Sequence, residues 1–308
     1  MLTPLARWLL LLNVIAQVGI VVTGGLVRLT GSGLGCPTWP QCMEGSYTPV
    51  VEPEMGIHPY IEFGNRTLTV VVGLTALAVL VIAIDQVLKG RTKSLLWAGF
   101  APILLVAAQA VIGGITVLTS LHPITVSTHF MVSILLIAAS VFACVRLDSP
   151  DGSLRPTVRR EVRLLAWAVG AAGLLVLILG TVVTGSGPHS GDADAPARYG
   201  FDPRTVSWLH ADVVMVFVGL LIGLVVAMRL VDAPARLQQA VWWTVAVTAV
   251  QGLIGYAQYF AGLPILLVLA HMLGAALLAI TLTLVLLPLG TRTPAVDAAP
   301  AELAHGRA

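Results

Sequence analysis

Eight long apolar stretches run through this 308-residue sequence, and each is long enough to cross a lipid bilayer as a helix. A spanning helix needs about 20 predominantly apolar residues, because the hydrocarbon core of a bilayer is about 30 Å thick. Only 10% of the residues are charged, whereas soluble domains carry about 25% charged residues. We therefore expect an all-α, polytopic membrane protein, with spans near residues 8–27, 67–88, 95–118, 124–145, 164–184, 207–228, 239–260 and 264–287.

The basic residues set the expected orientation, because Lys and Arg accumulate on the cytoplasmic side of membrane proteins. With both termini in the cytoplasm, thirteen of the 17 basic residues lie in cytoplasmic segments or their flanks: Arg7, Lys89, Arg91, Lys93, Arg146, Arg155, Arg159, Arg160, Arg163, Arg229, Arg236, Arg292 and Arg307. The external side keeps Arg28, Arg66, Arg198 and Arg204. We expect a multi-pass protein of the plasma membrane with both termini cytoplasmic and two long external loops, 28–66 and 185–206.

The two halves of the sequence resemble each other. The matching pairs are 20–24 with 181–185, 109–114 with 251–256, and His129 with His271, each histidine following the glutamine of the second motif by twenty residues. Two matches in the same order predict a duplicated four-helix unit. Because four is an even number of spans, the two copies have the same orientation, and a pseudo-twofold axis along the membrane normal should relate them.

This duplication predicts the domain organisation. We expect an N-terminal four-helix bundle over residues 1–146, with an external cysteine loop at 28–61, and a C-terminal bundle over 163–288. A cytoplasmic linker, 147–162, joins them. The tail, 289–308, is rich in Ala, Pro and Thr, a composition that predicts disorder.

Three histidines are expected inside the membrane, each near the external end of an even-numbered span: His129, His210 and His271. An imidazole in hydrocarbon is costly unless a partner satisfies it, so it either bonds a neighbouring helix or has a function. His210 and His271 occupy corresponding places in the second half, where two neutral imidazoles on facing helices suit the axial positions of a haem iron. A zinc site would need further carboxylates or thiolates.

The first half differs at one ligand. Asn65 occupies the place where a second histidine would pair with His129, and an amide is a poor iron ligand. Glu62 lies three residues before Asn65 on the same helical face, where it could act as a general base or be an ordinary interfacial carboxylate. Arg66 and Arg28 could pair with haem propionates or extend to the membrane interface, and the sequence leaves both readings open.

The cysteines allow more than one arrangement. Cys36 and Cys42 share the first external loop, where oxidising conditions favour a disulfide. Two free thiols or a metal site remain as alternatives. Cys144 lies in the fourth span, and we interpret it as a small core residue.

In combination, these residues resemble the heme A synthase family over essentially the whole chain. The resemblance rests on the sequence TGGLVRLTGSGLGC at 23–36, the Glu62 to Arg66 motif at the start of the second span, and the histidines of the fourth, sixth and eighth spans. It implies an enzyme that oxidises the C8 methyl group of heme O to a formyl group, with water-derived oxygen, making heme A for cytochrome oxidase.

The resemblance also implies roles for individual residues. The positions of His210 and His271 bind heme b in the family, His129 belongs to the half that takes heme O, Glu62 is the catalytic carboxylate, and Cys36 and Cys42 form an external disulfide. This chain departs from the family pattern at Asn65, where the family has histidine. We therefore expect either single-histidine ligation of heme O or a variant class in which Asn65 only lines the pocket. Loss of activity is the third alternative, and the intact Glu62, His129 and cysteine loop count against it.

The expected partners are heme O, a heme O synthase, membrane lipid, and a quinone or another electron acceptor, with no nucleic acid. The alternative function is a non-catalytic di-haem b protein that transfers electrons with quinone, and the missing ligand at Asn65 counts against it. A transporter is a further alternative, but it predicts broken helices at the membrane midplane.

Overall fold

The structure is a computed structural model that describes residues 2–50, 54–192 and 195–293. Eight of its helices are long and apolar enough to span a membrane. They are α1 (Pro4–Leu29), α2 (His58–Leu88), α3 (Leu95–Leu118), α4 (Pro123–Asp148), α5 (Arg160–Ser186), α6 (Pro203–Leu230), α7 (Ala235–Phe260) and α8 (Ile265–Leu286). The prediction of an all-α polytopic membrane protein is confirmed.

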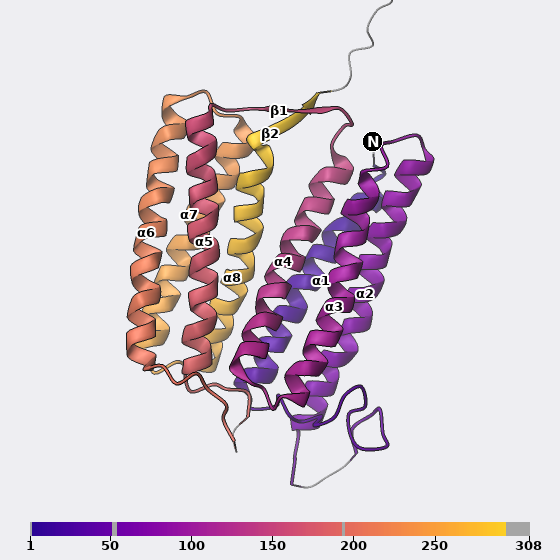
Figure 1. The fold of residues 1–308 in the computed structure, drawn as a ribbon, viewed down its shortest axis with the longest axis vertical. Helices are drawn as coiled ribbons and strands as arrows, with labels where there is room; N and C mark the ends of the chain where they lie inside the picture. The colour runs from indigo at the N-terminus through magenta and orange to yellow at the C-terminus, as the bar shows by residue number, and fades with distance from the viewer. Residues whose placement is uncertain (1, 51–53, 193–194, 294–308) are drawn as a thin grey trace, which may run out of the picture.

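The helices form two groups that stand side by side, α1–α4 and α5–α8 (Figure 1). In the first group each helix packs against its neighbours in sequence, and α4 returns to α1. The groups meet where α8 packs against α1 and α4, and where α4 packs against α5. The pseudo-twofold axis stays a prediction from the sequence. We call the end of the bundles with residues 30–57 and 187–202 the loop end, and the opposite end, with residues 149–159, the linker end.

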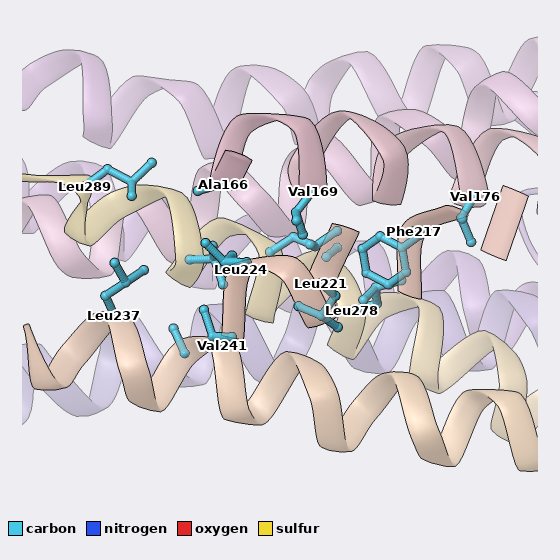
Figure 2. Packing of buried hydrophobic residues seen from close by; sticks show 14 of the residues in the cluster. Ala166, Val169, Val176, Phe217, Leu221, Leu224, Leu237, Val241, Leu278 and Leu289 are labelled. Carbon is cyan, nitrogen blue, oxygen red and sulfur yellow. The ribbon is translucent and has the colours of Figure 1, made fainter. Parts of the chain in front are cut away.

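Apolar side chains from several helices form the core of the second group. Figure 2 shows Phe217, Leu221 and Leu224 of α6 packed among residues of the neighbouring helices, including Val169 of α5 and Val241 of α7. Phe217 and Leu224 are almost completely buried. Because lipid is as apolar as these side chains, close packing rather than the exclusion of water holds such helices together.

Helix α2 begins well before its apolar stretch. The sequence predicted a span from residue 67, whereas the helix starts at His58, with Pro59 in its first turn. Proline suits this position because the first turn needs no donor from its backbone nitrogen. The extra turns place Glu62, Asn65 and Arg66 on the helix at the loop end, so the helix fixes their spacing.

Two short strands connect the halves at the linker end. Strand β1 (Ser153–Pro156) pairs antiparallel with β2 (Gly290–Thr293), which follows a 3-10 turn at Leu287–Leu289. Thr157 N also donates to Leu289 O at 3.1 Å. The predicted disordered tail, 289–308, therefore begins with an ordered segment, because backbone pairing with the linker satisfies its polar groups. Residues 294–308 lie outside the described residues.

An acidic residue of the linker ties the turn between α2 and α3 to the end of α4. Asp151 accepts hydrogen bonds from Thr92 N at 3.0 Å and from Arg146 Nη2 at 3.0 Å, and it pairs with Arg91 at 3.3 Å. Partial burial raises the pKa of Asp151, but the hydrogen bonds from Thr92, Arg146 and Arg91 outweigh it and lower the pKa to about 2. Charged hydrogen bonds favour the ionised carboxylate in this way.

Candidate functional site

In the second half, His210 lies on α6 and His271 lies on α8, each near the loop end of its helix. Each ring packs against a glycine of an adjacent helix. A methyl group added at Gly180 of α5 would lie 3.5 Å from His210 Cε1, and one at Gly255 of α7 would lie 3.5 Å from His271 Cε1. The Nδ1 atoms of both histidines are buried and have no hydrogen-bond partner among the described residues. These two imidazoles therefore have coordinating capacity to spare.

A glutamine positions the backbone beside a histidine in each half. Gln251 Nε2 donates to His271 O at 2.9 Å, and Gln109 Nε2 donates to His129 O at 3.0 Å. Gln109 Nε2 also donates to Ser133 Oγ at 2.5 Å. The sequence repeat that links each glutamine to a histidine thus corresponds to the same interhelical hydrogen bond in both halves.

In the first half, one histidine, His129, packs on a glycine as both histidines of the second half do. A methyl group at Gly113 of α3 would lie 3.2 Å from His129 Cε1, and the buried Nδ1 of His129 has no partner in the described ranges. At the other position, Thr23 Oγ1 of α1 donates to Asn65 Oδ1 at 2.7 Å. Gly19, which matches Gly180 in the sequence repeat, has no described heavy atom within 4 Å of an added methyl group. By the sequence repeat, this open position corresponds to the one that the His210 ring occupies in the second half.

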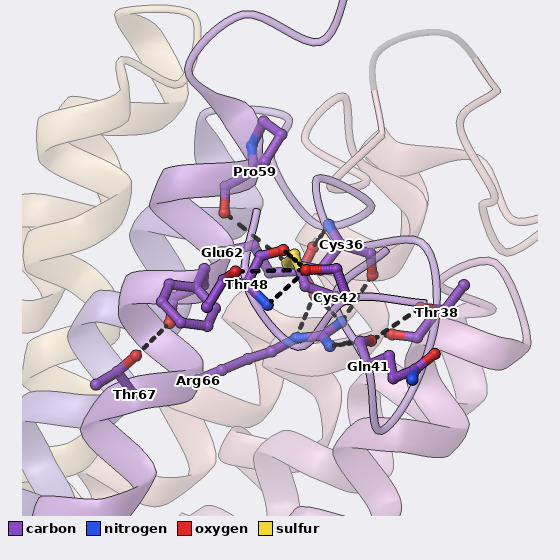
Figure 3. Close-up of a disulfide and its surroundings, with 11 residues drawn as sticks. Cys36, Thr38, Gln41, Cys42, Thr48, Pro59, Glu62, Arg66 and Thr67 are labelled. Carbon is purple, nitrogen blue, oxygen red and sulfur yellow. Dashed lines mark hydrogen bonds and ion pairs between the residues drawn. A yellow bond between two sulfur atoms is a disulfide. The ribbon is translucent and has the colours of Figure 1, made fainter. Parts of the chain in front are cut away.

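Glu62 is buried and holds the cysteine loop (Figure 3). Its Oε2 accepts a hydrogen bond from Cys36 N at 2.6 Å, and its Oε1 accepts from Arg66 Nε at 3.0 Å and Arg66 Nη2 at 2.5 Å. Arg66 lies one turn after Glu62 on α2, so the helix brings the two charges together. The pair anchors the loop to the helix that carries the candidate carboxylate.

Arg66 uses all of its donors in these contacts. Besides Glu62, it donates to the carbonyl oxygens of Thr38 and Gln41 from Nη1, at 3.0 and 3.1 Å, and of Cys36 from Nη2 at 2.7 Å. A guanidinium has five N–H groups, and these hydrogen bonds account for them. The structure thus adds a third arrangement to the two that the sequence left open, in which Arg66 organises the loop.

Arg28 connects the two halves at the loop end. It donates from Nε to His189 O at 2.7 Å and from Nη2 to Thr184 O at 3.0 Å. Near it, Gly33 N donates to Gly191 O at 2.9 Å. The long loop that precedes α6 in the second half therefore rests on the first half through backbone groups.

The Cys36–Cys42 disulfide is present in the structure, which confirms that pairing. The ring that it closes presents Trp39 to α3, where the indole lies so close to Gly114 that any side chain there would overlap it. Gly114 directly follows Gly113, the residue beside His129. The cysteine loop therefore reaches the same part of α3 as the histidine of the first half. Cys144 is partly buried and free.

The sequence did not reveal the residues that position the candidate site residues, namely Gly113, Gly255 and Arg66. Gly113 and Gly255 each lie four residues after the glutamine of the repeated motif, which is a signal of equivalence but not of a histidine contact. The role of Arg66 had no sequence signal, because its acceptors are backbone carbonyls of a loop.

The fold, with histidines on the spanning helices α4, α6 and α8, defines a multi-pass helical membrane protein with polar groups concentrated at one end of its bundles. Comparison with known proteins identifies the group to which it belongs. The pattern of the COX15-CtaA family, described as cytochrome oxidase assembly protein, matches residues 6–284. The chain belongs to this family.

Individual relatives cover less of the chain. The chain is 29% identical over 186 residues to a heme A synthase of Lysinibacillus sphaericus, which covers 58% of the chain and 57% of the relative. It is 27% identical over 163 residues to one of Alkalihalophilus pseudofirmus, covering 51% and 53%, and 32% identical over 118 residues to one of Geobacillus kaustophilus, covering 38% and 35%. At most, the chain spans somewhat more than half the length of these relatives.

Proposed function

We propose that this protein is a heme A synthase that oxidises the C8 methyl group of heme O to a formyl group. Membership of the cytochrome oxidase assembly family and relatives named heme A synthase support the proposal. The observation that carries it is the difference in potential iron ligands between the halves. The second half has His210 and His271, whereas the first has His129 and Asn65, with a buried Glu62 on the same helix as Asn65.

The second half fits a resident heme b. His210 and His271 each have an unpartnered buried Nδ1, and each ring lies beside a glycine that leaves it room. In the described part of the chain, no group of three or more His, Cys, Asp or Glu side chains could hold a metal ion. Two imidazoles therefore suit an iron whose other four ligands come from a porphyrin. When bound, heme b supplies one-electron transfer.

The first half is proposed to bind heme O, with His129 as its one protein ligand to iron. Asn65 cannot complete a bis-histidine site, so the substrate can exchange with product. Arg28 and Arg66 would fix the loops above the substrate rather than contact its propionates, because carbonyl groups and Glu62 already accept their hydrogen bonds.

Glu62 is proposed to accept protons from the reacting methyl group. A carboxylate has about four acceptor positions; Oε1 already accepts two N–H groups from Arg66, and Oε2 accepts one from Cys36. Oε2 therefore keeps a position for a proton. These hydrogen bonds also fix the orientation of the carboxylate, which general-base catalysis requires.

The overall reaction converts the methyl group and one water into a formyl group, four protons and four electrons. The formyl oxygen comes from that water, and the electrons leave to an acceptor of the quinone class or another membrane acceptor. A heme O synthase would supply the substrate. We place the protein in the bacterial plasma membrane with its linker end and both termini in the cytoplasm, as the distribution of Lys and Arg suggests.

Glu62→Gln tests the proposal in a host that makes heme O but lacks heme A. Haem is extracted from membranes with the native chain or the variant and analysed for heme A. We expect heme A with the native chain and none with Glu62→Gln, because the neutral amide cannot take up a proton. The haem b spectrum of the variant should be unchanged.

Asp85→Asn is the matched control, because Asp85 is a half-exposed carboxylate on the same helix, paired with Lys89 at 2.7 Å. It should make heme A normally. The Cys36–Cys42 disulfide is measured in both variants, so that a loosened loop is distinguished from lost chemistry. Normal heme A from Glu62→Gln would eliminate the assigned role.

A further inference from the structure

A group of polar side chains lies inside the first bundle, away from the loop end. Asn13 and Gln17, one turn apart on α1, are 0% and 1% exposed, and Thr75 of α2 and Ser140 of α4 are 8% and 1% exposed. We call these four residues the polar core cluster. Polar side chains buried at membrane depth are rare, and they mark binding sites or pathways unless they bond to each other.

The cluster lies at one depth in the bundle. Thr75 Oγ1 is 3.3 Å from Asn13 Oδ1, which joins α2 to α1. The ion pair of Arg7 with Asp148, at 3.0 Å, shows which residues of α1 and α4 lie level at the linker end. Asn13 follows Arg7 by six residues and Ser140 precedes Asp148 by eight, which puts them about 9 and about 12 Å above that ion pair at 1.5 Å per residue.

The hydrogen bonds within the cluster leave several of its atoms unsatisfied. Gln17 Nε2 donates to Asn13 Oδ1 at 3.3 Å. Asn13 Nδ2, Gln17 Oε1 and Ser140 Oγ are buried and have no partner among the described residues. The unpaired set thus contains an amide donor, an amide acceptor and a hydroxyl, which can do either.

The orientation of the two amides does not remove this imbalance. The nitrogen and oxygen of an amide are assigned from the hydrogen-bond network. If both amides are turned over, Asn13 donates to Gln17 through the same contact, and the unpaired atoms become Asn13 Oδ1 and Gln17 Nε2. In either orientation, one NH2 group and one carbonyl oxygen remain without a partner.

Along the helices, buried apolar residues follow the cluster in both directions. Toward the linker end lie the buried Leu10, Val79 and Leu147, and toward the loop end lie the buried Val21 and Val72. Neither lipid nor these neighbours can donate or accept hydrogen bonds, so the unpaired atoms need a small polar molecule.

We propose that the polar core cluster binds water inside the first bundle. One water can accept from the unpaired amide NH2 group and donate to the unpaired carbonyl oxygen and to Ser140 Oγ, which gives it the three or so hydrogen bonds that buried waters make. The cluster is uncharged and carries no thiolate or carboxylate, so its chemistry suits water rather than a metal ion.

The second half has no such cluster at the matching places. By the offsets of the sequence repeat, Leu174, Ile178, Leu220 and Leu282 correspond to Asn13, Gln17, Thr75 and Ser140. Gln17 lies six residues, about 9 Å along the helix, from Thr23, the partner of Asn65. On the proposed function, the site therefore stores water in the half whose reaction consumes it; that use rests on the proposed function, whereas the binding of water does not.

Radiolytic labelling of the full chain in lipid nanodiscs, in 18O-labelled water, tests for the site. A brief X-ray pulse makes hydroxyl radicals from water in place, so a buried side chain is labelled only where water lies beside it. Val72 and Val79 flank Thr75 on α2, and Phe217 and Leu224 hold the matching places on α6. All four are buried. We expect label on Val72 and Val79 and none on Leu224 or on the intrinsically more reactive Phe217.

Asn13→Leu, Gln17→Ile and Ser140→Leu, combined in one variant, install the residues of the second half. Label on Val72 and Val79 should fall to the level of Leu224, while gel filtration and heat stability show that the variant is folded. Equal labelling of the two helices in the native protein, or label that persists in the variant, would overturn the proposal. If the variant does not fold, the comparison of labelling on α2 and α6 in the native protein is sufficient to test the proposal. Heme A formation does not enter either readout.

Discussion

The two halves of this protein share the same contacts around one histidine but differ in a second side chain. Both hold a histidine beside a glycine and fix its backbone with a glutamine, Gln109 in one half and Gln251 in the other. At the second proposed ligand position, the C-terminal half has His210 and the N-terminal half has Asn65. On the proposed function, this one exchanged side chain separates a site that holds its occupant from one that releases it, although both halves keep the same histidine, glycine and glutamine contacts.

The loops at the loop end also differ between the halves. The first half has a disulfide ring anchored on α2 by Glu62 and Arg66, whereas the segment 187–202 of the second half contains no cysteine. Loops that carry function need a rigid scaffold to position them. The half assigned to the chemistry is the one whose loop is tied down most closely.

The largest expected effect is the loss of a cofactor. His210→Ala removes one of the two proposed axial ligands, so the purified variant should contain no heme b by pyridine haemochrome assay. His122→Asn is the control, because His122 caps α4 at the loop end and an asparagine can also cap a helix. A His210→Ala protein with its full haem content would contradict the contrast between the halves.

A smaller effect is expected from making the halves alike. Asn65→His adds an imidazole where Gly19 leaves space for it. Loaded with heme O, the variant should show a six-coordinate low-spin spectrum that the native protein lacks. Product should leave about tenfold more slowly if the new ligand contributes about 1.4 kcal/mol. A spectrum identical to that of the native protein would show that position 65 does not face the iron.

How far the sequence predicts this molecule depends on the kind of contact. The spans followed from apolar length alone, since lipid admits few other structures. His129, His210 and His271 stood out because imidazoles are rare in such segments. The anchoring of the cysteine loop by Arg66 could not be predicted, because backbone carbonyls of a loop leave no pattern in side chains. The pairing of Ser153–Pro156 with Gly290–Thr293 was missed for the same reason.

The smallest expected effect compares the two halves at the linker end. In the first half, Asp151 bridges Arg91 and Arg146. In the second, Arg229 contacts an aromatic ring, with its Cζ 5.7 Å from the Trp242 ring centroid. Because the folded pKa of Asp151 is about 2, below the ordinary value of 3.8, its stabilising effect is present above pH 4 and is lost as the pH falls toward 2.

Asp151→Asn should therefore lower the free energy of unfolding at pH 6 by about 1 kcal/mol or less, since the pair is partly exposed. The difference from the native protein should shrink as the pH falls from 4 and disappear below pH 2. Thermal unfolding of both proteins across this range measures it. A difference that is independent of pH would mean that the charge of Asp151 contributes nothing.

The two-stranded sheet of β1 and β2 at the linker end has a consequence for biosynthesis. Strand β1 lies between the two halves, whereas β2 follows the last spanning helix, so the ribosome releases the second strand only after every span has been made. Until then the linker has no strand to pair with. The pairing of β1 with β2 therefore forms last. A chain that ended just after α8 would still contain all eight spanning helices but would lack this pairing.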